Sequence, residues 1–305
     1  MRVLITGGAG FIGSNLSKEL LSKGYEAHLL DLSDKPAIKL NGATFHRGSI
    51  THPDVVDSAT EGCEAVFHEA ALISVQESIR NPEKFRKVNI EGTRNVLEAC
   101  RKNDVKKVIL ASSAAVYGDE PTLPKTENSK LEPKSPYAES KIQNEKDART
   151  YFEEYGLETV CLRYFNAYGP GQDPNSPYSG VISKFLDCAI RKKQPTIYGD
   201  GTQTRDFVFA KDVVNANFLA MEKKGIGGEI FNIATGKETS LLELWKEIEE
   251  ISGFKSKPGF APEREGDIIR SVASIEKAKR MLGYEPEYSI REGLEKTLEW
   301  VRHDR

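Results

Sequence analysis

Cysteine is scarce in this sequence, and none of the four cysteines forms a CxxC pair. The five histidines show no HExxH spacing either. A disulfide-stapled secreted fold and a structural zinc site are therefore poor interpretations. We expect no bound metal ion, and we expect free thiols in the reducing environment of the cytoplasm.

An excess of one charge and long apolar runs are also absent. The chain has 43 Lys and Arg against 46 Asp and Glu, a formal net charge of −3 over 305 residues. Nucleic-acid binding needs a clustered basic excess, so we do not expect it. Without a run of about 18 apolar residues, we expect no membrane span. The opening MRVLITGGAG lacks a signal-peptide pattern, which favours a cytoplasmic protein.

Short apolar runs alternate with helical patterns through the first half of the chain. Runs rich in Val, Ile, Leu and Phe predict strands at 2–6, 25–31, 43–49, 64–70 and 106–112. Apolar residues at three- and four-residue spacing predict helices at 12–23 and 89–103. This alternation is typical of βαβ units, whose right-handed crossovers build a doubly wound parallel sheet in an α/β fold.

The pattern changes after about residue 165. Residues 168–180 are dense in Gly, Pro, Asn and Ser and predict a loop. Beyond it we expect helices near 180–193, 211–223, 240–252, 274–282 and 290–302, with short strands at 196–198 and 230–233. We therefore predict a first domain at 1–165 and a smaller α/β lobe at 166–305, with segments near 205–235 returning to the first.

A glycine-rich loop, GGAGFIG, follows the first expected strand and opens the first helix. Gly7 permits a tight turn, Gly10 lets the backbone approach a pyrophosphate, and Gly13 allows close helix packing. The helix start, with Phe11 and Ile12, offers unpaired N–H groups to phosphates. An ordinary turn is the alternative, but the position between strand and helix favours a dinucleotide site.

Asp31 ends the second expected strand, about 20 residues after the glycines, where an acid can bind the adenosine ribose. A carboxylate there would repel a 2′-phosphate, and Leu32 offers no positive charge to attract one. NAD is therefore favoured over NADP. The alternative is that Asp31 only caps a helix or turn.

Tyr137 is the only one of 11 tyrosines with a lysine, Lys141, four residues later. In a helix that spacing places both side chains on one face. Ser113 ends the fifth expected strand, at the edge where open parallel sheets bind ligands. A phenol with a pKa of about 10 is a poor base, but nearby cations lower that value. We expect Ser113 to bind the reacting oxygen while Tyr137 moves its proton; capping is the alternative for Ser113 and for Ser112.

Several motifs together resemble the extended short-chain dehydrogenase/reductase family. They are GGAGFIG, Asp31, HEAAL (68–72), SSAAVYG (112–118), YAESK (137–141), LRYFNAYGPGQ (162–172), TIYGDGTQTRDFV (196–208) and REGDIIRS (264–271). The likeness runs nearly end to end. It is greatest to UDP-glucose 4-epimerases and UDP-N-acetylglucosamine 4-epimerases, and it implies a Rossmann-type NAD-binding domain and a C-terminal lobe for the nucleotide sugar.

The resemblance also implies roles for individual residues. The catalytic group falls on Ser113, Tyr137 and Lys141. NAD contacts fall on the glycine loop and on Asp31, Ser49, Ile50, Ala70, Ala71, Leu72, Asn89, Ser112, Tyr137, Lys141 and Phe165. Substrate contacts fall on Ser113, Tyr137, Asn166, Val181, Lys184, Tyr198, Arg205, Arg264, Asp267 and Ser271. Two positions depart from the pattern: Ser49 replaces an Asp of many relatives, and Ile73 replaces a Lys of some epimerases.

The reaction implied is 4-epimerisation of a UDP-hexose through a transient 4-keto sugar. Tyr137 takes the proton of the 4-hydroxyl, NAD accepts and returns the hydride, and Arg205 and Arg264 hold the diphosphate. Either arginine could instead form a surface ion pair. A dehydratase, decarboxylase or reductase of nucleotide sugars remains an alternative, as does a non-catalytic NAD sensor. Dehydratases of the family usually carry an acid pair where this chain has Ala114 and Ala115.

Two further expectations rest on the family. Relatives pair through two helices, here 86–103 and 136–155, which implies a homodimer. The small Ser271, four residues after Asp267, would leave room for an N-acetyl group beside the sugar. The alternative is that Ser271 sits in a strand and never meets the sugar.

Overall fold

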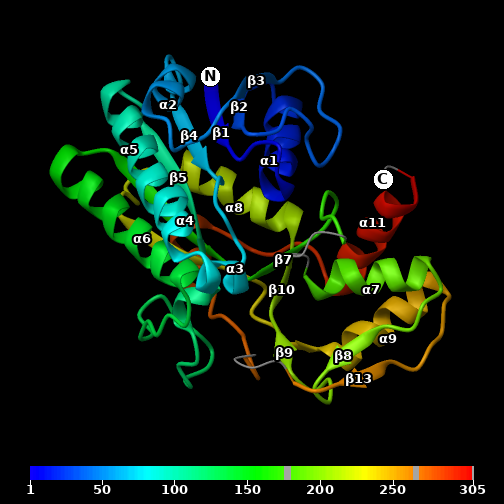
Figure 1. Cartoon of the computed structure of the whole chain (residues 1–305). Coiled ribbons are helices and arrows are strands. Elements are labelled where there is room, and N and C mark those ends of the chain that lie inside the picture. Colours follow the sequence, from blue (N-terminus) through cyan, green and yellow to red (C-terminus); the bar gives the residue numbers. More distant parts are fainter. Residues whose placement is uncertain (175–179, 264–267, 304–305) are drawn as a thin grey trace.

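A seven-stranded parallel sheet forms the centre of the computed structural model, which describes residues 1–174, 180–263 and 268–303 (Figure 1). The strand order is β3-β2-β1-β4-β5-β6-β11. The strands are β1 (Arg2–Thr6), β2 (Glu26–Asp31), β3 (Thr44–Arg47), β4 (Ala65–His68), β5 (Lys107–Ser113), β6 (Glu158–Tyr164) and β11 (Glu229–Ile233). This sheet confirms the predicted doubly wound α/β fold.

Helices cover both faces of the sheet (Figure 1). One face carries α2 (Pro53–Thr60), α5 (Gly92–Lys102) and α6 (Pro136–Tyr155). The other carries α1 (Phe11–Ser22), α8 (Ala210–Glu222) and α10 (Glu276–Leu282). The central strands are buried on both sides, which is why they read as continuous apolar runs rather than alternating ones. In the described part of the chain, no helix is long and apolar enough to cross a membrane.

The chain reverses its direction of travel across the sheet next to β1. It moves outward from β1 through β2 to β3, then returns to place β4 on the other side of β1. Crossovers that leave in opposite directions open a crevice at the carboxyl ends of these strands. The glycine loop after β1 and the HEAAL segment after β4 therefore meet at one edge.

A smaller lobe contains the remaining long helices, α7 (Val181–Ile190), α9 (Leu241–Ser252) and α11 (Ile290–His303). Three two-stranded sheets accompany them: β7 (Asn166–Tyr168) with β10 (Phe207–Phe209), β8 (Thr196–Tyr198) with β13 (Gly259–Ala261), and β9 (Thr204–Arg205) with β12 (Thr239–Ser240). Phe185, Trp245 and Leu294 lie in the core of this lobe.

The structure differs from the sequence-based expectation in two elements that border the crevice. Strand β6 was not predicted, although it pairs with β5 along its whole length. The helix expected at 89–103 begins as an α-helix only at Gly92. Before it come α3 (Val75–Arg80), α4 (Pro82–Phe85) and a π-helical turn, Arg86–Glu91. Such turns are frequent at functional sites.

Candidate active site

The glycine loop has the geometry of a phosphate cradle. Gly7 has φ +68°, and a Cβ there would lie 2.7 Å from the backbone nitrogen of Ala70. A Cβ on Gly13 would overlap the carbonyl oxygen of Gly7. Gly10 precedes α1, whose N-terminus has no side-chain cap and no acidic residue in its first turn. The uncapped N–H groups and the open loop fit the pyrophosphate of a dinucleotide.

Asp31 joins the end of β2 to this loop. Its Oδ2 accepts a hydrogen bond from the backbone N–H of Ala9 at 3.0 Å, and its Oδ1 accepts one from Ser33 at 3.0 Å. The capping alternative is thus present in the structure. A carboxylate oxygen can accept two hydrogen bonds, so each oxygen of Asp31 can still accept one from a ribose hydroxyl. The two interpretations of Asp31 are compatible.

Asn89 shapes the crevice from within the protein. Its side chain accepts a hydrogen bond from the Leu72 N–H at 2.8 Å and donates to the Leu72 carbonyl at 2.9 Å and to Ser140 Oγ at 3.1 Å. The residue is fully buried. Asn89 therefore holds the loop that contains Ala70, Ala71 and Leu72, which are half-buried. Contact between Asn89 and the cofactor, which the resemblance implies, stays a prediction.

Other predicted cofactor residues are largely enclosed by protein. Ile50 packs in the core beside α5, and its carbonyl accepts from Asn95 at 3.0 Å. Phe165 lies in the opposite core, and Ser49 bonds within its own turn to Thr51. Ser112 donates a hydrogen bond to the buried Glu145 at 2.6 Å, and its contact with the cofactor stays a prediction.

Ser113, Tyr137 and Lys141 meet at the carboxyl end of β5. Pro136 at the first turn and the Ser135 cap, which accepts from the Ala138 N–H at 3.2 Å, start helix α6. Ser113 accepts from the Ala115 N–H and is hydrogen-bonded to the buried phenol of Tyr137. It is therefore both a cap and a partner of Tyr137.

The pKa of Tyr137 differs in direction from the sequence-based expectation. Burial raises it, and the hydrogen bond with Ser113 only partly opposes that change. The Lys141 ammonium donates to the Ala111 carbonyl at 2.7 Å and lies 5.9 Å from the centre of the Tyr137 ring. Burial lowers the pKa of Lys141 to about 8, with Glu69 opposing, so this lysine remains largely protonated at neutral pH.

Glu69 is an ionisable group that sequence reasoning did not assign. Glu69 directly follows β4. The hydroxyl of Tyr164, the last residue of β6, donates a hydrogen bond of 2.8 Å to the Glu69 carboxylate. Burial raises its pKa to about 7, against the Tyr164 hydrogen bond and the charge of Lys141. Its place in HEAAL, directly after a buried strand, was the available signal. The neighbouring His68 is a core residue between Thr6 and Thr93, and burial lowers its pKa to about 3.

A cavity of about 870 Å³ opens in the second lobe. Five predicted substrate residues line it: Asn166, Val181, Lys184, Tyr198 and Arg205. The wall also contains residues to which the sequence analysis gave no role, such as Gln172, Phe185 and Gln203, although Gln172 and Gln203 lie within the motifs LRYFNAYGPGQ and TIYGDGTQTRDFV. Val75, the first residue of helix α3, also lines the cavity, which therefore extends to that helix.

Arg205, one of these five, also donates a hydrogen bond to the Thr204 carbonyl at 2.8 Å. Of the predicted substrate residues outside the cavity wall, Ser113 and Tyr137 belong to the group at the end of β5 described above. Ser271 is half-buried and is not among the residues of the cavity wall. Arg264 and Asp267 lie outside the described residues.

Comparisons with known proteins agree with this geometry. Residues 3–234 match the model of the NAD dependent epimerase/dehydratase family. A putative UDP-glucose 4-epimerase of Methanocaldococcus jannaschii is 40% identical over 306 residues, covering 99% of both chains.

Two solved structures show the same fold over nearly the whole chain. The UDP-glucose 4-epimerase of Thermotoga maritima, solved with UDP-glucose, has a TM-score of 0.94 at 40% identity and covers 99% of each chain. The UDP-N-acetylglucosamine 4-epimerase of Methanobrevibacter ruminantium, solved with UDP-N-acetylmuramic acid, has a TM-score of 0.93 at 35% identity, covering 99% of this chain and 98% of that one. With its glycine loop, its Ser113–Tyr137–Lys141 group and this similarity, the chain belongs to the NAD dependent epimerase/dehydratase family, and its cofactor is NAD.

Proposed function

We propose that this enzyme catalyses the 4-epimerisation of UDP-hexoses, interconverting UDP-glucose and UDP-galactose. The observation that carries the proposal is the buried Tyr137, hydrogen-bonded to Ser113 and followed by Lys141, at the carboxyl edge of the sheet. The similarity to 4-epimerases over 99% of the chain supports the substrate class. Residues 1–165 would bind NAD, and residues 166–305 would mainly bind the sugar nucleotide.

The residues at the carboxyl edge of the sheet would each have a separate role in the reaction. NAD, when bound, supplies the acceptance and return of a hydride at C4 of the sugar. Ser113 orients the 4-oxygen, and Tyr137 exchanges the proton with it. Lys141 holds a positive charge on the same helical face, which favours the phenolate form of Tyr137. Asp31, Gly7, Gly10 and Gly13, with Phe11 and Ile12, would hold the dinucleotide.

The second lobe would hold the diphosphate while the sugar turns between its two orientations. Arg205 is suited to this because a guanidinium binds phosphate bidentately. Val181, Lys184 and Tyr198 would surround the nucleotide, and Asn166 would contact the sugar. Arg264 and Asp267 remain predictions from the motif alone.

Another conversion of nucleotide sugars is the alternative. The 3₁₀ turn after Ser113 spans Ala114–Tyr117 and contains no acid, whereas dehydratases usually carry an acid pair there. A non-catalytic NAD sensor is disfavoured because Tyr137 and Lys141 are both present and close together.

Incubation with UDP-galactose, with no added cofactor, tests the proposed function. We expect UDP-glucose to form, because the enzyme regenerates its bound NAD in every turnover. Chromatographic separation of the two sugars measures the product. Formation of a dehydrated, decarboxylated or reduced sugar instead would reject the epimerase assignment in favour of the alternative.

Substrate breadth depends on Ser271. A small residue there leaves room for an N-acetyl group at C2, so we expect conversion of both UDP-galactose and UDP-N-acetylglucosamine. Ser271→Tyr should selectively abolish the second by steric clash, with Ser271→Ala as the matched control that keeps both. Rates on the two sugars measure this. Wild-type protein that converts UDP-galactose but not UDP-N-acetylglucosamine would refute the role of Ser271.

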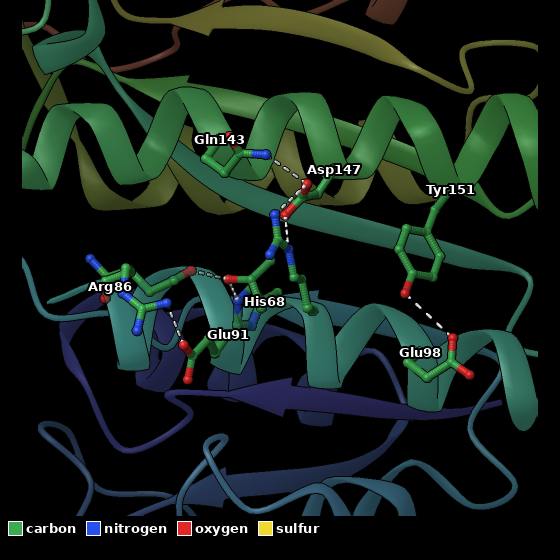
Figure 2. Close-up of polar contacts among 10 residues, drawn as sticks. His68, Arg86, Glu91, Glu98, Gln143, Asp147 and Tyr151 are labelled. Atoms are coloured by element: carbon green, nitrogen blue, oxygen red, sulfur yellow. Dashed lines mark hydrogen bonds and ion pairs between the residues drawn. The ribbon is translucent and has the colours of Figure 1, made fainter. Parts of the chain in front are cut away.

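We further propose a homodimer through α5 and α6. Polar contacts already join these two helices within one chain, including Arg94 with Asp147 at 2.7 Å and Tyr151 with Glu98 at 3.4 Å (Figure 2). Their outer faces would pair with the same faces of a second copy, making a symmetric interface. Analytical ultracentrifugation should show a dimer at micromolar concentration, and a monomer there would contradict the proposal.

A further inference from the structure

Asp206 is a fully buried aspartate between β9 and β10. Its Oδ1 accepts hydrogen bonds from Thr235 N–H at 2.8 Å and Thr235 Oγ1 at 2.6 Å. Its Oδ2 accepts from Gly236 N–H at 2.9 Å and Ala273 N–H at 3.2 Å. Burial raises the pKa of Asp206, and these hydrogen bonds oppose the change. The carboxylate therefore joins the turn after β11 to the segment that follows Ser271.

The backbone of the same residue holds another part of the site. The carbonyl of Asp206 accepts from the Asn166 N–H at 3.1 Å and from Asn166 Nδ2 at 3.3 Å. Arg205 precedes Asp206 directly, and both Asn166 and Arg205 line the cavity. One buried residue thus connects several separate segments that border the proposed substrate site.

The segment around Ser271 is held on both sides. Before it, Ile269 accepts from the Thr204 N–H at 2.9 Å, and Arg270 pairs with Glu238. After it, Ala273 donates to Asp206. The position of Ser271 relative to Arg205 therefore depends on Asp206 at one end.

We propose that Asp206 is the positioning residue of the substrate site, setting Asn166, Arg205 and the Ser271 segment in one arrangement. The inference rests on the proposed function, since it concerns the binding of the UDP-sugar. Asp206 is fully buried, so it acts through the residues that it holds. A shift of about 1 Å in such groups can cost about 10²-fold in rate.

Asp206→Asn tests the proposal directly. The amide keeps the shape of the side chain, but one of the two acceptor oxygens becomes an NH₂ group. Because N–H donors face both oxygens of Asp206, this NH₂ group meets N–H donors in either orientation of the amide. We expect the Kd for UDP, measured by calorimetry, and the KM for UDP-galactose to rise at least about tenfold. The amount of NAD that co-purifies should stay at the wild-type level, because the glycine loop is unaffected.

Asp212→Asn is the matched control. Asp212 is also buried, and it accepts from the N–H groups of Glu287 at 2.9 Å and Tyr288 at 3.4 Å. None of these partners is a predicted substrate residue. We expect this variant to lower the melting temperature while leaving the Kd for UDP unchanged.

A milder pair of variants covers the case in which Asp206→Asn does not fold. Thr235→Val removes the hydroxyl donor to Asp206 but keeps its N–H, whereas Thr235→Ser keeps both. The Kd for UDP should rise several-fold in the first and remain normal in the second. Equal affinities in both, or an unchanged Kd in a folded Asp206→Asn protein, would overturn the positioning role. Failure of wild-type protein to bind UDP would instead reject the proposed function, and the inference with it.

Discussion

Tyr137→Phe should lower turnover by at least about 10²-fold while NAD remains bound, the low end for general acid–base catalysis. The substitution removes only the phenolic hydroxyl, to which the proposed function assigns the proton exchange and which pairs with Ser113. Lys141 and the glycine loop keep their positions. Steady-state rates with UDP-galactose and assay of the dinucleotide released on denaturation measure the two expectations.

The control for this prediction is a second buried tyrosine that is not part of the Ser113–Tyr137–Lys141 group. Tyr284 is fully buried and donates to the Ala234 carbonyl at 2.9 Å. Tyr284→Phe should cost about 1 kcal/mol of stability, as for one lost hydrogen bond, with unchanged turnover. Near-normal turnover in Tyr137→Phe would remove that residue from the mechanism.

Glu145→Gln should destabilise the protein by about 3–5 kcal/mol, the usual cost of leaving a buried charge without its partner. Glu145 is 4% exposed and Arg163 is 2% exposed, and they form two hydrogen bonds at 2.8 and 2.7 Å. Ser112 also donates to Glu145. The amide cannot neutralise the guanidinium, so the folded state carries an unpaired charge. Urea denaturation, extrapolated to water, measures the free energy of unfolding.

Asp119, which pairs with Lys134 at 3.1 Å, is the matched control. The side chains of Asp119 and Lys134 are 53% and 62% exposed. Asp119→Asn should cost at most about 1 kcal/mol, because water screens a surface ion pair. Equal losses in the two variants would show that burial does not decide the strength of the Glu145–Arg163 pair.

Much of the cofactor site could be predicted from sequence because its signals are local. The glycine loop, the first helix and Asp31 follow one another within 31 residues, and the structure places them at one edge of the sheet. The spacing of Tyr137 and Lys141 predicted a helix around them, and helix α6 (Pro136–Tyr155) brings the two side chains close together. The bounds of that helix came from the resemblance to the family, whereas the spacing along one element or one turn determines the geometry of the other features.

The partners of buried polar groups could not be predicted in this way. The sequence did not indicate that the side chains of Asn89 and Ser112, both expected at the cofactor, form hydrogen bonds with Leu72 and Glu145. Burial of the Tyr137 phenol raises its pKa, whereas charge alone suggested a decrease. A sequence pattern indicates that a side chain is polar and near a strand end, but it does not identify the group opposite.

The sequence by itself determined the first five strands and the helical patterns between them, the glycine loop, the tyrosine–lysine pair and the resemblance to the family. Only the tertiary structure decided that Asp206 contacts residues 29 to 67 positions away, at 235 and 273, and that Glu69 contacts Tyr164. The physical reason is that periodicity and turn chemistry act within a few residues, whereas a buried carboxylate must be hydrogen-bonded by whichever donors the fold brings to it.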